Sequence, residues 1–285
     1  MQQTIANKLT IEGIGLHSGV KSTLTLKPAK ANTGIVFIRT DIDNAKPIAA
    51  KYDNVIDTKN CTCIGYDKSN MVSTIEHLMA ALYIMQIDNV IVETSALEMP
   101  IVDGSSQLFL QKLQEVGTKK LATKRKYIKV LQKVEVADDK GNKVALEPAD
   151  DLYINFVIEF PSKIVGRQEF DGVINKEIFK KEIAPCRTFC EKYQIDYLRS
   201  IGLIKGGTLE NGVVLDGDTI LNPDGFKVKN ECVNHKVLDA IGDMYTAGYP
   251  VLGKLSAYKT GHYHNNLILK KLFVDTKNYQ IIEKE

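Results

Sequence analysis

Residues 73–82 read STIEHLMAAL, and this stretch decides how the first half of the chain folds. Apolar residues recur along it at helical spacing: Ile75, Leu78, Met79, Leu82 and Met85. This period predicts a helix with a buried face. Ser73 opens the segment and Glu76 follows three residues later, which is the spacing of a capping box. We therefore expect a helix whose first turn carries the Glu76 carboxylate and the His77 imidazole.

Strand-like segments flank this helix on both sides. Apolar and polar residues alternate, between glycine-bearing turns, over residues 10–14, 22–26, 34–39, 90–94, 127–136, 144–147, 152–160 and 253–259. Further helices are predicted at 106–116, 176–183, 193–201 and 231–247, with a last one beginning near Asn265. The strands and helices segregate within each half of the chain, and this favours the α+β class over alternating βαβ units.

A basic run between residues 117 and 126 interrupts the strand and helix patterns. Its charged members are Lys119, Lys120, Lys124, Arg125 and Lys126. Such a run is usually a solvated linker. We therefore expect an N-terminal domain over residues 1–122 and a C-terminal domain over residues 127–285.

The composition is that of a globular protein in a reducing compartment. Hydrophobic residues make up 44% of the 285 residues, and 37 basic against 35 acidic residues leave a net charge of +2. This balance argues against nucleic-acid binding by bulk charge. Five cysteines form no disulfide framework, the N-terminus lacks a secretory pattern, and the longest apolar stretch, residues 78–87, is too short for a transmembrane segment. We expect a cytoplasmic protein.

Two histidines and an aspartate have the chemistry of a metal site. His235 and Asp239 are four residues apart in a predicted helix, so both project from one face. With His77 they would supply two imidazoles and one carboxylate, which leaves a coordination position on zinc open for water. Glu76, next to His77, is the candidate base for that water.

Each of these features has a second interpretation. A His-x-x-x-Asp pair is often only a hydrogen-bonded pair on a helix surface. From spacing alone, Glu76 is better explained as the second half of the capping box than as a catalytic residue, and a carboxylate folded onto its own backbone cannot act as a base. Asp243 and His262 either form a carboxylate–imidazole pair, which would keep the imidazole protonated, or are two exposed polar residues. Spacing alone leaves these alternatives open.

Taken together, the motifs resemble the UDP-3-O-acyl-N-acetylglucosamine deacetylase family. The matching segments are STIEHLMAAL at 73–82, PIVDGSS at 100–106, RTF at 187–189, HKVLDAIGD at 235–243 and GH at 261–262. They occur in the order of the family and extend from GIGLHSG at 13–19 to NN at 265–266. The glycines at 13–19 precede a predicted strand rather than a helix, so they indicate a tight turn and not a dinucleotide fingerprint. We assign no catalytic role to His17.

The resemblance implies a role for each matching side chain. It makes His77, His235 and Asp239 the metal ligands, and Glu76 the general base. His262, held by Asp243, becomes the general acid, Thr188 stabilises the oxyanion, and Lys236 neutralises charge. Phe160 matches a position that stacks on uracil, although a core phenylalanine is an equally good explanation. Phe189, Leu198 and Ile201 are further expected substrate contacts.

The resemblance also implies an architecture. Two similar α+β domains would each pack helices on one face of a β-sheet, with the helices sandwiched between the sheets and the active site at the domain junction. The first domain carries a small β insert. The second carries a βαβ insert, within residues 189–214, that forms an apolar passage for the acyl chain. Its apolar residues are Ile195, Leu198, Ile201, Leu203 and Ile204.

Some residues depart from the family pattern. Cys186 and Cys190 flank the RTF motif, and His264 follows His262 by two residues; we treat His264 as peripheral. Cys61 and Cys63 lie in the first insert, where we expect structural thiols.

The resulting expectation is a zinc-dependent deacetylase of lipid A biosynthesis that hydrolyses the N-acetyl group of a UDP-linked acylated amino sugar. Iron (Fe²⁺) is the alternative to Zn²⁺, because two histidines and a carboxylate suit both ions. We expect a monomer with at most transient contact with a membrane surface. Two rival functions are another zinc amidohydrolase and a non-catalytic nucleotide-sugar-binding module.

Overall fold

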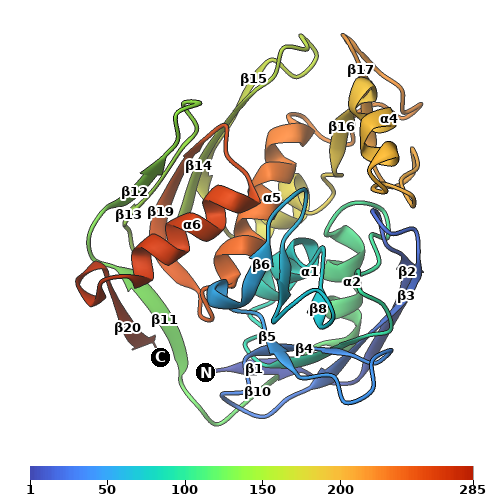
Figure 1. Cartoon of the computed structure of the whole chain (residues 1–285). Helices are drawn as coiled ribbons and strands as arrows, with labels where there is room; N and C mark the ends of the chain where they lie inside the picture. The colour runs from blue at the N-terminus through green and yellow to red at the C-terminus, as the bar shows by residue number, and fades with distance from the viewer. Residues whose placement is uncertain (285) are drawn as a thin grey trace.

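The computed structural model describes residues 1–284 and contains two large β-sheets with helices between them (Figure 1). The strands of the first sheet, in spatial order, are β2 (Leu9–Ile14), β3 (Lys21–Pro28), β9 (Val90–Thr94), β4 (Ile35–Arg39) and β5 (Ile48–Ala49). Strands β2 and β3 form a hairpin through the 13–19 segment, and the amide of Gly15 bonds to the carbonyl of Val20. The tight turn predicted there is confirmed.

The second sheet is built around β19 (Val251–Tyr258), which pairs with three other strands. The remaining members are β11 (Arg125–Val130), β12 (Val134–Ala137), β13 (Lys143–Pro148), β14 (Leu152–Glu159), β15 (Arg167–Val173) and β20 (Tyr279–Lys284). Strand β19 is buried along most of its length, as a central strand covered by helices must be.

Four helices fill the space between the sheets: α1 (Glu76–Ile84), α2 (Gln107–Val116), α5 (Glu231–Tyr245) and α6 (His262–Phe273). Buried apolar side chains form two clusters, one against each sheet, and α1 contributes Leu78 to the first cluster and Ala80 to the second. The α+β class and the sandwiched helices are therefore confirmed. Within residues 1–284, no helix combines the length and apolar character needed to cross a membrane.

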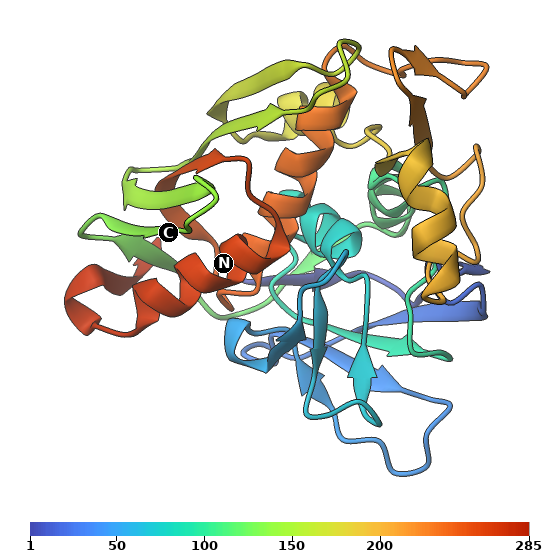
Figure 2. The same cartoon turned by 45° about the horizontal axis from the view of Figure 1, so that its top comes forward.

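Smaller elements are attached to the two large sheets and the helices between them. A three-stranded sheet of β6 (Val55–Asp57), β7 (Cys63–Gly65) and β8 (Met71–Val72) precedes α1. In the C-terminal half, β16 (Phe189–Glu191) and β17 (Val213–Asp216) run parallel, with α4 (Lys192–Ser200) between them and β18 (Thr219–Ile220) beside β17. Figure 2 shows α4 and these strands as an arm at the edge of the molecule, on the side away from α6.

The remaining elements are short. They are η1 (Tyr52–Asn54), α3 (Lys176–Ile178), the π-helical turn η2 (Phe179–Ile183) and η3 (Thr276–Asn278). The single helix predicted over 176–183 is thus an α-helical turn that widens into a π-helical one. The last helix begins at His262, three residues before the predicted start, so His262 lies in its first turn.

The basic run is only partly a linker. Strand β10 (Thr118–Lys120) pairs antiparallel with β1 (Gln3–Ile5), so three of its residues are held by the N-terminus of the chain. Arg125 already belongs to β11 and forms an ion pair with Asp88. The domain boundary within this run stays a prediction.

The capping box predicted at the start of α1 is wrong. The helix begins at Glu76, and the Ser73 hydroxyl donates to the carbonyl of Leu97. The Glu76 carboxylate accepts a hydrogen bond from the amide of Thr62, 14 residues earlier in the chain. Tertiary contacts take the place of the local cap, and the Glu76 carboxylate makes no capping hydrogen bond with the backbone of its own helix.

Helices α1 and α5 are in close contact at Gly242. A Cβ atom at this position would lie 2.1 Å from the carbonyl oxygen of Glu76, well inside contact distance. Only glycine therefore permits this approach, which sets the start of α1 directly against the middle of α5.

Gly242→Ala is expected to lower the free energy of unfolding by about 1–3 kcal/mol, because the added methyl group must push the helices apart in a close-packed core. Urea denaturation would measure the change. Gly172→Ala is the matched control, since a Cβ there meets only the Phe170 ring at ordinary contact distance. Equal stability of Gly242→Ala and the unmodified protein would contradict this account of the helix contact.

Candidate active site

His77, His235 and Asp239 converge at the contact between α1 and α5. One side-chain atom from each lies within 4.8 Å of the other two, and all three residues are buried. Oδ1 of Asp239 lies 3.4 Å from Nε2 of His235 and 3.7 Å from Nε2 of His77. Two imidazole nitrogens and a carboxylate oxygen thus face one point from two helices.

The neighbours of these side chains leave the converging atoms free. The Cys186 carbonyl lies 3.0 Å from Nδ1 of His235, which directs the other ring nitrogen toward the centre. Lys236 donates to Oδ2 of Asp239 at 2.8 Å. Among residues 1–284, Oδ1 of Asp239 has no hydrogen-bond partner although it is buried. A buried carboxylate oxygen without a donor, between two imidazole nitrogens, fits a divalent cation.

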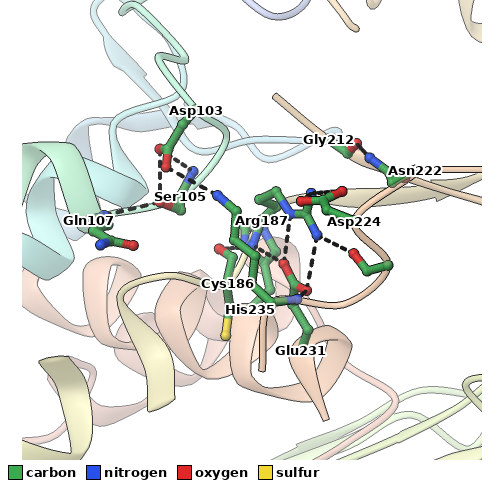
Figure 3. Close-up of polar contacts among 12 residues, drawn as sticks. Asp103, Ser105, Gln107, Cys186, Arg187, Gly212, Asn222, Asp224, Glu231 and His235 are labelled. Atoms are coloured by element: carbon green, nitrogen blue, oxygen red, sulfur yellow. Dashed lines mark hydrogen bonds and ion pairs between the residues drawn. The ribbon is translucent and has the colours of Figure 1, made fainter. Parts of the chain in front are cut away.

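A buried ion pair fixes the loop that orients His235. Arg187 is 1% exposed and bonds to Glu231, the first residue of α5, through Nε–Oε1 (2.9 Å) and through its backbone amide (2.9 Å). Its guanidinium also reaches Asp224 and the carbonyl of Gly225 (Figure 3). This multiple attachment ties the 186–188 loop to the start of α5, four residues before His235.

Glu76, Asp243 and His262 lie beside the converging ligands. Nδ1 of His262 is 2.9 Å from Oδ2 of Asp243, and its Nε2 is 3.8 Å from Oε1 of Glu76. Nε2 of His262 is also 3.9 Å from Oδ2 of Asp239. The predicted carboxylate–imidazole pair of Asp243 and His262 is therefore present, and it is buried rather than exposed.

Burial and neighbouring charges separate the histidines into two kinds. Burial lowers the pKa of His77 to about 3, helped by His235 nearby, and it also lowers the pKa of His235. Burial acts against the charge of His262 as well, but Asp243, Asp239 and Glu76 outweigh it and raise the pKa to about 10. His77 and His235 are therefore neutral, as metal ligands must be, while His262 carries a proton.

The carboxylates also differ. Burial raises the pKa of Glu76 well above its ordinary value. Burial opposes ionisation of Asp239 too, but His235 and Lys236 overcome it and lower the pKa of Asp239. These directions belong to the side chains alone. A dication beside Asp239 would lower the pKa of Glu76, because positive charge favours the carboxylate.

Thr188 and Lys236 border the same centre. Both line a small cavity of about 30 Å³ together with Glu76, His77, His235, Asp239 and His262. Thr188 is fixed there through its backbone, since its amide donates to Gly104 and its carbonyl accepts from Val213. The structure thus brings both residues to the small cavity, and the roles that the resemblance implies for them stay predictions.

A larger cavity of about 400 Å³ opens from this centre toward the arm formed by β16, α4 and β17. Phe189, Ile195, Leu198 and Ile204 line it together with Val213 and Leu221. Ile201, also expected there, is 43% exposed instead. Helix α4 ends at Ser200, so Ile201 follows the helix and does not belong to the face that carries Ile195 and Leu198. Ile201 is not among the residues that line this cavity, and its contact with substrate stays a prediction.

Phe160 lies close to both Lys236 and Phe189. It lines a separate cavity of about 180 Å³ with Lys236, Lys259 and Thr260, and its ring centroid is 5.5 Å from that of Phe189. Phe160 is partly exposed and also packs against the hydrophobic core of the C-terminal half, so both interpretations of this residue stay open.

Sequence patterns missed two residues at this site and placed one correctly outside it. His17 lines both the small and the larger cavity, although its motif predicted only a turn. Thr62 bonds to both Glu76 and Asp243, and no motif marked it. His264 is peripheral, as expected, because its Nε2 contacts Asp138 on the far side of α6. The thiols of Cys61 and Cys63 are buried 3.6 Å apart.

Two imidazoles and a carboxylate around one point, with a further carboxylate and a protonated imidazole beside them, define the site of a metallohydrolase. Comparison with known proteins gives the family. Residues 2–274 match the family model for UDP-3-O-acyl N-acetylglycosamine deacetylase. The chain belongs to this family, and the resemblance noted from its motifs is confirmed.

Individual relatives agree over nearly the full length. The chain is similar to several proteins named UDP-3-O-acyl-N-acetylglucosamine deacetylase. The one from Shewanella sp. (strain W3-18-1) has 42% identity over 100% of this chain and 93% of the relative. The relative from Anaeromyxobacter sp. (strain Fw109-5) has 42% identity over 99% and 91% of the two chains. That from Aliarcobacter butzleri (strain RM4018) has 40% identity over 100% and 93%.

The raised pKa of His262 predicts a pH-dependent contribution to stability in the metal-free protein. Protonated His262 stabilises the fold fully below its ordinary pKa of 6.5, and this stabilisation is lost as the pH rises through about 10. The difference in free energy of unfolding between the unmodified protein and His262→Gln should therefore shrink as the pH rises. Urea denaturation in the presence of a chelator would measure it. A difference that stays constant over this range would show that His262 is not held in its charged form.

Proposed function

We propose that this chain is a metal-dependent deacetylase that hydrolyses the N-acetyl group of UDP-3-O-acyl-N-acetylglucosamine, in the committed step of lipid A biosynthesis. The observation that carries the proposal is the convergence of His77, His235 and Asp239 beside the Glu76–His262 pair, in a chain of this family. We assign the metal as zinc, with iron(II) as the alternative for the same ligand set.

His77, His235 and Asp239 would hold the ion. Zinc bound there supplies Lewis-acid chemistry, since it polarises a carbonyl and makes a water molecule more acidic. Lys236, bonded to Oδ2 of Asp239, leaves Oδ1 for the ion and adds positive charge beside the amide. The remaining catalytic work falls to side chains of the protein.

The two proton transfers are assigned to Glu76 and His262. As water adds to the acetyl carbonyl, Oε1 of Glu76 takes its proton, and the Thr188 hydroxyl donates to the oxygen that becomes negative. The C–N bond then breaks, and Nε2 of His262 gives its proton to the departing nitrogen. The products are acetate and a free amine. Asp243 holds the His262 ring by Nδ1, so that Nε2 faces the reaction.

The cavities suggest how the substrate is placed. The acyl chain is assigned to the 400 Å³ cavity, whose wall includes Leu198 and Ile195 of α4. The uracil is assigned to the neighbourhood of Phe160, where Lys236 and Lys259 provide positive charge for the diphosphate. The cytoplasmic location, the monomeric state and a transient membrane-surface contact stay predictions.

Glu76→Gln is expected to bind zinc in the normal ratio but to lose about 10²- to 10⁴-fold in kcat, the usual value of a general base. Asp239→Ala is expected to lose the metal as well as activity. Acetate release from UDP-3-O-acyl-N-acetylglucosamine and metal analysis of the purified proteins measure the two effects. Normal turnover by Glu76→Gln would refute its role, and absence of any tightly bound metal would favour a binding module.

Leu198→Trp is expected to shorten the acyl passage. Each methylene kept out of an apolar site costs about 0.8 kcal/mol, so exclusion of two methylenes would lower kcat/KM for the long-chain substrate about tenfold. A short-chain substrate should lose much less. Tyr197→Trp, on the exposed side of the same helix, is the matched control. Equal losses with both chain lengths would contradict this assignment, and full indifference to the acyl chain would favour another zinc amidohydrolase.

A further inference from the structure

Thr62 lies in a buried loop that reaches from the N-terminal half into the candidate active site. It directly precedes β7 and is 2% exposed. Its neighbours Cys61 and Cys63 are each 4% exposed and turn their thiols toward each other. The Thr62 carbonyl accepts a bond from the amide of Ile75, which ties the loop to the residue before α1. The loop is therefore attached to the start of α1 at Thr62 itself.

Two hydrogen bonds connect Thr62 to the carboxylates of the site. Its backbone amide donates to Oε2 of Glu76 at 3.0 Å. Its hydroxyl donates to Oδ1 of Asp243 at 2.6 Å. Glu76 begins α1 and Asp243 lies in α5, so one residue from a loop joins two helices that belong to different halves of the chain.

The hydroxyl completes the set of partners that Asp243 needs in order to hold His262 in one orientation. Oδ2 of Asp243 receives Nδ1 of His262 and the side-chain amide of Asn265, each at 2.9 Å. Oδ1 receives the Thr62 hydroxyl. With both oxygens bonded, the carboxylate cannot rotate without losing a bond, and the His262 ring follows the carboxylate.

The amide of Thr62 does the same for the other proton-transfer group. It occupies Oε2 of Glu76, and Oε1 then lies toward Nε2 of His262, 3.8 Å away. A base with one oxygen bonded to the backbone and the other free is oriented for a single proton acceptance.

We propose that Thr62 is a positioning residue that orients the general base and the general acid together, through its amide on Glu76 and its hydroxyl on Asp243. This inference rests on the proposed roles of Glu76 and His262. Thr62 does not touch the reacting atoms, so it acts on the rate of the chemical step rather than on the binding of substrate or metal.

Thr62→Val tests the proposal, because it removes the hydroxyl and keeps the shape and the backbone amide. A hydrogen bond to a charged group is worth about 1.5–3 kcal/mol, so kcat should fall about 10- to 100-fold while KM and zinc content stay unchanged. Thr62→Ser restores the hydroxyl and should recover most of kcat. If Thr62→Val does not fold, Thr62→Ala removes the same hydroxyl without burying a new methyl group against Asp243.

A double-mutant cycle separates positioning from loss of stability. In the Asp243→Ala background the Thr62 hydroxyl has lost its acceptor, so adding Thr62→Val should lower kcat no further. Thr94→Val is the matched control, because Thr94 is a buried threonine whose hydroxyl bonds to Ala96 away from the site. It should lower the urea midpoint to a similar degree and leave kcat unchanged.

Three outcomes would overturn the proposal: normal kcat in Thr62→Val, no recovery in Thr62→Ser, or full additivity with Asp243→Ala. Glu76→Gln and His262→Gln, assayed alongside, distinguish these failures from a failure of the proposed function. If both lose kcat while Thr62→Val does not, only the role of Thr62 is wrong. If Glu76→Gln turns over normally, Glu76 is not the general base, and the positioning role of Thr62 is rejected with it.

Discussion

The contact between α1 and α5 at Gly242 is the constraint on which the active site depends. Helix α1 carries Glu76 and His77, and α5 carries His235, Asp239 and Asp243. Since the Glu76 carbonyl lies where a Cβ of residue 242 would be, the two helices are separated by backbone thickness alone at this point. A displacement of either helix would therefore move the base and one ligand relative to the others, and the two large sheets act mainly as supports that hold this contact in place.

Charge compensation is the second requirement, because the same contact buries several ionisable side chains. A buried charge is tolerated only when it is paired and hydrogen-bonded. Arg187 forms an ion pair with Glu231 at the start of α5, and Lys236 forms one with Asp239 in the middle of the helix. One turn further along α5, Asp243 forms an ion pair with His262. Each of these three acidic residues of α5 is therefore paired with a cation, and each pairing also fixes the orientation of a side chain at the site.

Spacing along one helix made part of the site predictable. The four-residue interval between His235 and Asp239 indicated a shared face, because helix geometry is local, and the segregation of strands and helices indicated the α+β class. The residue types also made His77 a candidate third member of this group, but nothing local relates residues 158 positions apart, so only the family resemblance singled it out. The hydroxyl of Tyr245 bonds to the carbonyl of Ile87 over the same separation in sequence. Roles that depend on contacts between distant residues cannot be predicted from the periodicity of the sequence.

Tertiary contacts explain what the patterns missed. Ser73 and Glu76 have the spacing of a capping box, but the Thr62 amide takes the carboxylate, and a burial preference of this kind leaves no trace in local sequence. Thr62 itself stands between two cysteines, and its hydroxyl belongs to no recognisable motif. Ile201 fits an apolar helix face by its type, yet the helix stops one residue earlier, and helix ends are the least predictable feature of a pattern.

The pairing of Asp239 with Lys236 has a consequence for how the protein acquires its metal. Small zinc domains cannot fold without their ion, because their ligands would otherwise repel one another or stay exposed. Here Lys236 and His262 already balance the acidic side chains, and two large apolar cores support the surrounding helices. The arrangement therefore favours a fold that can form without the ion, so that the side chains able to hold it are already in place when an ion binds.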